Sequence, residues 1–145
     1  MPLECTVLCV DNSPAMRNCD YPSGTRLEVA LDTSRMIALR KLGANVESAV
    51  GLVSLGVLTT GCVEVKSSPS NSRSKLEARL AEIKLGGEIK FANGLRVAML
   101  CLQKRANKRG ESRIVAFVGS SVEKHLTEKS AKKLGTKLRK NGVNL

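Results

Sequence analysis

The chain has 145 residues, the size of one domain, and 42% of them are hydrophobic, so it can build a core of its own and is not expected to be globally disordered. Aromatic residues are nearly absent, with two Phe and one Tyr, so the core must be aliphatic. The net charge of +11 is uneven, because residues 104–145 carry +9 and the preceding residues only +2. This asymmetry points to an acidic partner, either nucleic acid or an acidic protein surface.

The five cysteines include no C-x-x-C pair, and His125 is the single histidine, so a structural zinc site is not expected. Cys5 and Cys9 fall in one apolar run and Cys101 in another, where a free cysteine behaves as a small buried hydrophobe. This usage favours a reducing compartment. No signal peptide and no apolar run of roughly 18 residues is present, so we expect no membrane association and a cytoplasmic and nuclear location.

The stretch from Cys5 to Val10 is apolar or β-branched without a break, and Asp11, Asn12 and Ser13 follow it directly. Such an unbroken run is typical of a strand that is covered on both faces. In an open α/β sheet, ligands and partners meet the carboxyl end of a central strand. We therefore expect the functional surface to lie around Asp11.

A loop over residues 14–24, rich in Pro, Asn, Asp, Ser and Gly, precedes the first helix. Thr25 and Glu28 have capping-box spacing, in which each side chain satisfies a free backbone N–H group of the first turn. The apolar spacing carries this helix to about Leu42, and Gly43 is well placed to end it.

The next segments predict two strands. Residues 46–55 are mostly apolar and indicate a second buried strand, after which residues 56–61 turn the chain. Residues 62–66 alternate between apolar and polar, as a half-exposed edge strand does. Residues 67–74 then read as a loop of Ser, Pro and Asn.

A short amphipathic helix follows, with Ser74 and Glu77 as a second capping-box pair and Gly86–Gly87 as its end. The side chains expected to face inward are Leu76, Leu80 and Ile83. Residues 95–102 are apolar nearly all round and predict a largely buried helix.

The last third predicts a strand over residues 113–118 and an amphipathic helix over residues 127–141, followed by the start of a strand at residues 143–145. The side chains of this helix expected to face inward are Ala131, Leu134 and Leu138. Those expected to face solvent are Lys129, Lys132, Lys133, Lys137 and Lys140.

Strands separated by helices predict one α/β domain over residues 1–145. We expect a doubly wound, mostly parallel sheet with helices on both faces and an antiparallel edge strand. We also expect the domain to be truncated, lacking C-terminal strands and a helix. In that case the strand over residues 113–118 forms an edge of the sheet, and such an edge is prone to pair with other chains.

Several stretches carry a family resemblance. Residues 11–15, Asp-Asn-Ser-Pro-Ala, resemble the Asp-x-Ser-x-Ser metal-ion-dependent adhesion loop of von Willebrand factor A domains. More closely, stretches across nearly the whole chain resemble, in the same order, the N-terminal domain of the ubiquitin-receptor subunit of the proteasome regulatory particle. They are residues 3–13 with 16–18, 50–52, 94–98, and 113–120 with 122–123. The resemblance implies a von Willebrand A-like fold.

This chain departs from the family pattern at the metal site. Ala15 replaces the second serine, Asn93 stands where a second loop would bring a Thr, and Gly119 stands where a third loop would bring an Asp. Divalent cations of this kind prefer about six oxygens, several of them charged. Since Asp11 alone remains as a carboxylate, we predict no metal site and no cofactor. We expect Asp11 to accept hydrogen bonds from loop N–H groups instead.

The resemblance implies a non-catalytic interaction domain. It would anchor a ubiquitin receptor in the 26S proteasome regulatory particle, in contact with lid and base subunits, and so support ubiquitin-dependent protein degradation. Polyubiquitin would be captured only by segments absent from this chain. We predict that the partner-binding residues are Asp11, Ser13, Arg17, Asn93 and Ser120.

The basic last third leaves an alternative, a nucleic-acid-binding domain. Lysines on a helix would contact phosphates, but no recognition motif is present and few aromatic side chains are available to stack on bases. A helix face of this kind is most often simply solvated. Catalysis is not expected, because the sequence offers His125 no paired serine or cysteine nucleophile, and we expect this histidine to be exposed or to cap a helix.

Overall fold

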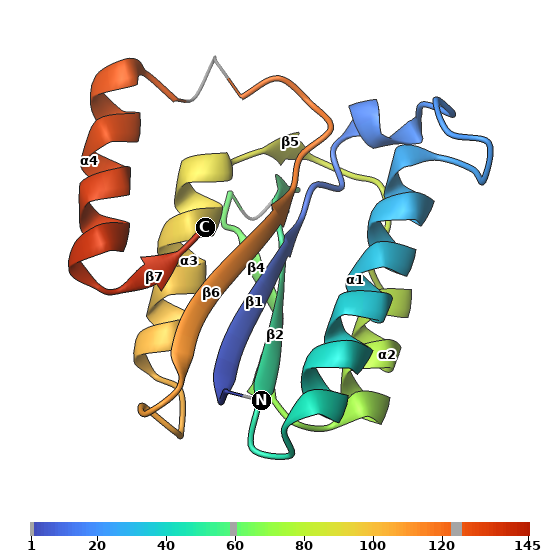
Figure 1. Ribbon diagram of the computed structural model, residues 1–145. Coiled ribbons are helices and arrows are strands. Elements are labelled where there is room, and N and C mark those ends of the chain that lie inside the picture. The colour runs from blue at the N-terminus through green and yellow to red at the C-terminus, as the bar shows by residue number, and fades with distance from the viewer. Residues whose placement is uncertain (1, 59–60, 123–125) are drawn as a thin grey trace.

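Strand β1 (Glu4–Val10) lies at the centre of the sheet. In the computed structural model, which describes residues 2–58, 61–122 and 126–145, it pairs in parallel with β2 (Ala49–Ser54) and with β6 (Glu111–Phe117). Beyond these strands, β4 (Glu64–Ser70) pairs antiparallel with β2, and β7 (Val143–Asn144) pairs in parallel with β6. The strand order of this five-stranded sheet is therefore β4-β2-β1-β6-β7 (Figure 1).

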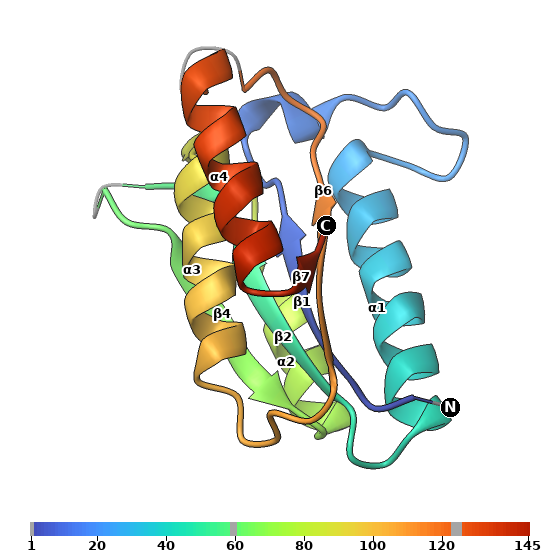
Figure 2. The same cartoon turned by 60° about the vertical axis from the view of Figure 1, so that its left-hand side comes forward.

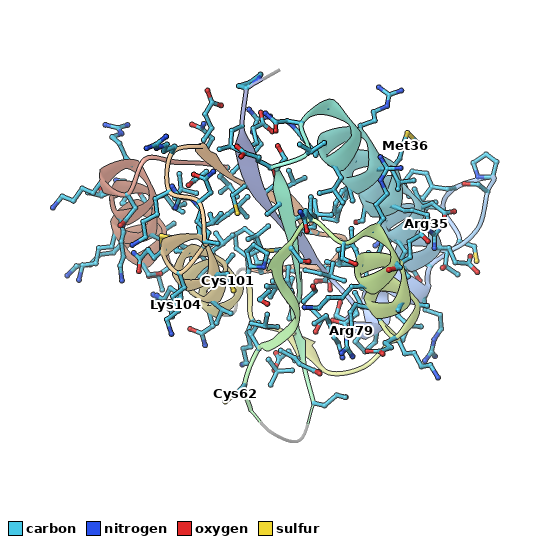
Figure 3. All side chains as sticks on the ribbon, turned by 90° about the horizontal axis from the view of Figure 1, so that it is seen from below. Arg35, Met36, Cys62, Arg79, Cys101 and Lys104 are labelled. Carbon is cyan, nitrogen blue, oxygen red and sulfur yellow. The ribbon has the colours of Figure 1, made fainter. Side chains whose placement is uncertain are left out.

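Helices cover both faces of this sheet. Their bounds are α1 (Arg26–Ala44), α2 (Arg73–Ala81), α3 (Phe91–Gln103) and α4 (Glu128–Lys140), with a short 3-10 helix, η1, at Pro14–Arg17. Helices α1 and α2 lie on one face and α3 and α4 on the other, so that Met36 and Cys101 sit on opposite sides of the sheet (Figure 3). Figure 2 shows α4 lying beside α3, above the short strand β7. The predicted α/β architecture is confirmed.

A small second sheet lies at the carboxyl end of the central strands. It pairs β3 (Gly56–Val57) with β5 (Glu88–Ile89). The sequence predicted only a turn over residues 56–61, and residues 59–60 of that turn lie outside the described part of the chain.

The unbroken run of apolar or β-branched residues from Cys5 to Val10 in β1 has a simple cause. All seven of its residues are buried, and successive side chains point to opposite faces. Val7 and Cys9 pack with α3 and α4, while Leu8 and Val10 pack with α1 and α2. A strand that is covered on both sides cannot alternate between apolar and polar residues, so the prediction of a central strand is confirmed.

Helix α1 begins as predicted and ends later. The Thr25 hydroxyl accepts a hydrogen bond from the Glu28 backbone N–H at 3.2 Å, and the Glu28 carboxylate accepts one from the Thr25 N–H at 2.7 Å. The helix passes through Gly43, however, and its cap is Asn45. A glycine ends a helix by adopting a positive φ, and Gly43 does not adopt one, so the predicted stop is wrong.

Helix α2 is shifted relative to the prediction. Its cap is Ser72, whose hydroxyl accepts from the Lys75 N–H at 3.4 Å, and not the predicted pair of Ser74 and Glu77. The segment holds serines at 70, 72 and 74, and Ser72 is the one with extended backbone directly before the first turn. The helix ends at Ala81 and not at the two glycines. Its predicted inward residues are buried: Leu76, Leu80 and Ile83.

The second and third predicted strands also have different bounds. Strand β2 is shorter than residues 46–55, because Val46 is 82% exposed and lies outside the sheet. Strand β4 runs over 64–70 rather than 62–66, so it includes Pro69 in what the sequence indicated as a loop. An edge strand tolerates proline. The Pro69 ring lies against Gly51 of β2, and the pairing of the two strands is irregular there.

The two helices on the other face differ in burial. Helix α3 begins at Phe91, earlier than predicted, and is buried on one face only, since Arg96 is exposed and Leu100 is 53% exposed. Helix α4 matches its prediction: Leu134 and Leu138 are buried, Ala131 is half-buried, and the lysines predicted to face solvent are exposed. His125 lies outside the described residues.

Burial of the β1 thiols generates a pH prediction. Desolvation raises the pKa of the Cys9 thiol from 9.0 to about 12, with a smaller contribution from Cys101. Between pH 9 and 12 the unfolded chain therefore loses a proton that the folded chain keeps, so stability falls as pH rises through this range. The contribution of one proton is about 1.4 kcal/mol per pH unit.

Urea unfolding measured at pH values above 9 should thus show a steeper loss of stability for the wild type than for Cys9→Ala. The comparison concerns the two slopes, because the substitution also leaves a cavity that lowers stability at every pH. Equal slopes would show that Cys9 ionises in the folded chain as readily as in the unfolded one.

Candidate functional site

The site is built around the carboxylate of Asp11, which directly follows β1 and is completely buried. One oxygen, Oδ1, accepts a hydrogen bond from the Ser13 N–H at 2.9 Å. The other, Oδ2, accepts from the Gly119 N–H at 3.0 Å and from the Ser120 hydroxyl at 2.7 Å. The Asp11 carboxylate therefore joins the end of β1 to the loop after β6, and the prediction that it accepts hydrogen bonds from loop N–H groups is confirmed.

Asn12 holds a different set of loops at the same end of the sheet. Its Nδ2 group donates to the Lys84 carbonyl at 3.0 Å, and its Oδ1 accepts from the Gly56 N–H at 2.7 Å. Its backbone carbonyl accepts from the Gly86 N–H at 2.8 Å. A Cβ atom at Gly56 would overlap the Asn12 amide, so this close approach requires glycine. The sequence reading assigned Asn12 no role of its own.

Arg26 was also missed by the sequence reading. It donates from Nη1 to the Gly119 carbonyl at 2.6 Å and forms an ion pair with Asp20. The loop after β6 is thereby tied to the loop before α1 as well as to Asp11. The backbone at Gly119 also lies so close to the Met16 side chain that a Cβ atom added there would overlap the sulfur. An Asp at this position, as in the family pattern, would require the Met16 side chain to shift.

The five predicted partner-binding residues fall at this end of the sheet but differ in exposure. Asp11 and Ser13 are buried, Ser120 is half-buried, and Arg17 and Asn93 are exposed. A completely buried carboxylate cannot contact a partner directly. The Asp11 side chain can act only by positioning the loop above it, which corrects the prediction that it is itself a partner-binding residue.

The residues present do not fit a divalent cation. Both Asp11 oxygens already accept hydrogen bonds from the protein. The Asn93 Oδ1 accepts from the Arg96 guanidinium at 2.9 Å, which places a positive charge beside this position. No group of three potential ligands among His, Cys, Asp and Glu occurs within residues 2–58, 61–122 and 126–145. A cation of this kind prefers about six oxygens, so no chemistry is assigned to a metal here.

A hollow of about 380 Å³ opens beside this cluster. Pro14, Ala15 and Ile89 make its lining mostly apolar, and Ser13 and Ser120 also line it. Within the described residues, the buried Ser13 hydroxyl has no hydrogen-bond partner. Its lining includes one carboxylate, that of Glu88, which is 58% exposed and forms an ion pair with Lys90, and includes no histidine or cysteine.

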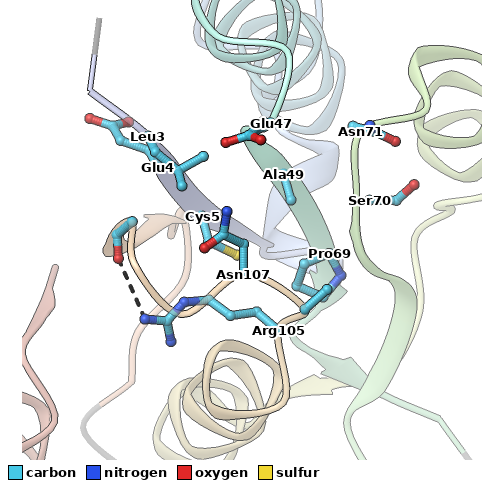
Figure 4. Close-up of a pocket in the computed structure, with 12 residues that line it drawn as sticks. Leu3, Glu4, Cys5, Glu47, Ala49, Pro69, Ser70, Asn71, Arg105 and Asn107 are labelled. Atoms are coloured by element: carbon cyan, nitrogen blue, oxygen red, sulfur yellow. Dashed lines mark hydrogen bonds between the residues drawn. The ribbon is translucent and has the colours of Figure 1, made fainter.

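A second hollow, of about 320 Å³, lies at the opposite end of the sheet (Figure 4). Arg105 crosses it and donates to the carbonyls of Leu102 at 2.6 Å, Lys108 at 3.2 Å and Gly110 at 3.4 Å. The guanidinium therefore holds the loop between α3 and β6. Glu4 lines the same hollow and is paired with Lys41. Arg105 and Glu4 thus both have structural partners at this end of the sheet.

The fold and the strand-end loop define a class of protein. Residues 6–121 match the family model described as von Willebrand factor type A domain. The chain therefore belongs to the von Willebrand factor type A domain family.

Within this family, its similarity is to subunits of the proteasome. It is 37% identical over 145 residues to the 26S proteasome non-ATPase regulatory subunit 4 homolog of Oryza sativa subsp. japonica, covering all of this chain and 35% of that protein. It is 36% identical over 143 residues to the 26S proteasome regulatory subunit rpn10 of Schizosaccharomyces pombe, covering 99% of this chain and 56% of that protein. The chain thus spans about a third to just over half of these relatives.

Solved structures agree. The crystal structure of the SpRpn10 VWA domain superposes with a TM-score of 0.87 at 35% identity, covering 97% of this chain and 71% of that one. The D319A mutant of the PilB minor pilin from Streptococcus sanguinis, at 19% identity and a TM-score of 0.61, shares the fold over 80% of this chain and 29% of its own. The sequence resemblance to the proteasomal von Willebrand A domain is confirmed.

Replacing Asp11 by Asn tests the hydrogen-bond cluster. An amide has one acceptor where the carboxylate has two, so its NH₂ group must face either the Ser13 N–H or the Gly119 N–H. We expect the free energy of unfolding, measured in urea, to fall by about 1–3 kcal/mol. The control is Asp20→Asn, because this exposed partner of Arg26 should lose less than about 1 kcal/mol. If Asp11→Asn and the wild type have equal free energies of unfolding, the hydrogen bonds of Asp11 do not stabilise the fold.

A second test concerns cations. Millimolar Mg²⁺ or Mn²⁺ should leave the melting temperature unchanged, because the ligand positions are occupied by Ala15, Asn93 and Gly119. Binding at a hundredfold excess over Kd would stabilise the chain by about 2.7 kcal/mol. A rise of several degrees that EDTA reverses would contradict our interpretation of this site.

Proposed function

We propose that this chain is a non-catalytic protein-interaction domain that anchors a ubiquitin-receptor subunit in the 26S proteasome regulatory particle. The observation that carries the proposal is similarity along the whole chain, at 33–37% identity, to proteins named as proteasome regulatory subunits. The site supports it, since the strand-end loop of a von Willebrand A fold is here held by hydrogen bonds and offers no catalytic pair.

The docking surface we propose lies above Asp11. Arg17 and Asn93 are exposed there and Ser120 is half-buried, while Asp11 and Ser13 support them from beneath. Exposed arginine is a common anchor of protein interfaces. The partners we propose are lid and base subunits, in the cytoplasm and the nucleus. Polyubiquitin would be bound by segments absent from this chain, so the chain supports ubiquitin-dependent degradation through its position in the particle.

Membrane association forms no part of this proposal. Within the described residues, no helix combines the length and the apolar character that a bilayer crossing requires.

Co-purification tests the proposal. The tagged chain, expressed in eukaryotic cells, should retain proteasome regulatory subunits, and Arg17→Glu should reduce their recovery at least about tenfold, because it reverses a charge at the interface. The matched control is Arg40→Glu, an exposed arginine on α1 that lies outside the proposed surface. Loss of recovery in both variants, or in neither, would contradict this docking surface. Recovery of polyubiquitin without proteasome subunits would contradict the proposed function.

The basic face of α4 distinguishes this proposal from nucleic-acid binding. Its exposed residues are Lys129, Lys132, Lys133, Lys137, Arg139 and Lys140. We expect only weak RNA binding, lost near physiological salt, because phosphate contacts without base stacking are strongly screened. Reversal of Lys129, Lys133 and Lys137 to Glu should abolish that binding and leave the melting temperature unchanged. Sub-micromolar RNA affinity of the wild type at physiological salt, in a filter-binding assay, would favour the nucleic-acid function.

A further inference from the structure

A row of exposed lysines, spaced four residues apart, runs along one side of α4: Lys129, Lys133 and Lys137. The next position in this row is Asn141, whose Oδ1 accepts a hydrogen bond from the Nε2 group of Gln103 at the end of α3, at 3.1 Å. Gly135 and Arg139 border a hollow beside β7, and residues two positions apart on a helix do not share a side. The lysine row is therefore on the α3 side of α4 and not on the β7 side.

Helix α3 adds an apolar side chain and a further lysine to the same surface. Leu100 precedes Gln103 by three residues, so it lies on the same side of α3, and it is 53% exposed. Lys104 follows Gln103 directly and is exposed, at the end of α3 and on the same side of the sheet as α4 (Figure 3). Together these residues form a basic helix surface: Leu100, Lys104, Lys129, Lys133, Lys137 and Lys140.

The charge of the basic helix surface is not balanced by its own helices. Helix α3 contains no acidic residue, and α4 contains one, Glu128, which pairs with Lys132 outside the row at 2.8 Å. Like charges four residues apart on a helix repel one another, so the lysine row lowers the stability of α4. A glutamate within the row would stabilise the helix. The row thus works against the fold, which indicates that its charge serves binding.

We propose that the basic helix surface binds an acidic segment of a partner protein. Carboxylates of the segment would meet the lysine row, and an apolar side chain among them would meet Leu100. Single-stranded nucleic acid is disfavoured, because stacking needs aromatic side chains, and α4 has none while Phe91 of α3 packs against the core. A second copy is disfavoured by the net charge of +11 on each chain. This surface is separate from the docking surface above Asp11, so the proposal goes beyond the function proposed above.

The test uses the purified chain and a fluorescein-labelled probe peptide, in which one leucine is flanked by three glutamates on each side. Fluorescence anisotropy at low ionic strength, where charges are screened least, should give a Kd on the order of 10–100 µM. The same peptide with glutamines in place of the glutamates should not bind. Alanine in place of the leucine should weaken binding about threefold, because the contact with Leu100 is lost.

Two pairs of matched variants locate the binding. Lys133→Glu reverses the middle of the row and should weaken the probe at least about tenfold. Lys75→Glu, at an exposed lysine of α2, changes the net charge by the same amount and should weaken it less than about twofold. Leu100→Gln should weaken the probe about threefold. Met36→Gln, at a residue of α1 that is 54% exposed against 53% for Leu100, should leave the affinity unchanged.

The melting temperature of each variant checks its fold. Lys133→Glu places a negative charge within the lysine row and should not lower this temperature. If a variant unfolds, the comparison of the glutamate and glutamine peptides on the wild type still decides.

Equal loss of affinity in Lys133→Glu and Lys75→Glu would overturn the proposal, because the probe would then respond to net charge alone. Undiminished binding of the glutamine peptide would overturn it as well. Tighter binding of hexauridine than of the peptide, at the same ionic strength, would assign the surface to nucleic acid instead. Failure of the peptide to bind would also overturn the proposal but leaves the co-purification result unaffected, since that experiment reports on Arg17 above Asp11.

Discussion

The buried carboxylate of Asp11 is the constraint on which this end of the molecule depends. A negative charge without solvent contact must be matched by hydrogen bonds, and here the donors come from Ser13, Gly119 and Ser120. Two of these residues lie more than a hundred positions further along the chain. The geometry of the docking surface proposed above Asp11 is therefore fixed by one side chain at the end of β1. Arg26 adds to this by donating a hydrogen bond to the Gly119 carbonyl.

Much of the fold could be predicted from the sequence because its signals are local. The apolar run of β1 follows from burial on two faces, the Thr25–Glu28 capping box from contacts three residues apart, and the pattern of α4 from one buried and one solvated face. These features depend on residues that are neighbours in sequence. The same holds for the hydrogen-bonded role of Asp11, which its place at the end of a buried strand indicated.

What the sequence did not reveal depends on contacts between distant residues. Asn12 bonds to Gly56 and Lys84, 44 and 72 positions away, and Arg26 bonds to Gly119, 93 positions away. No local pattern marks such partners. The shifted bounds of β4 and α2 have a related cause: Pro69 is accepted because it lies on an edge strand, and Ser72 is chosen among three serines by the backbone that precedes the helix. The burial of Asp11, which excludes direct contact with a partner, likewise required the packed structure.

The loop after β6 is fixed by hydrogen bonds before any partner binds, because Gly119 and Ser120 are the residues that Asp11 holds. A partner that meets the docking surface proposed above Asp11 therefore meets an ordered loop and loses less entropy on binding than it would at a free one. In this chain the aspartate of an adhesion-type loop orders a backbone through its protein donors.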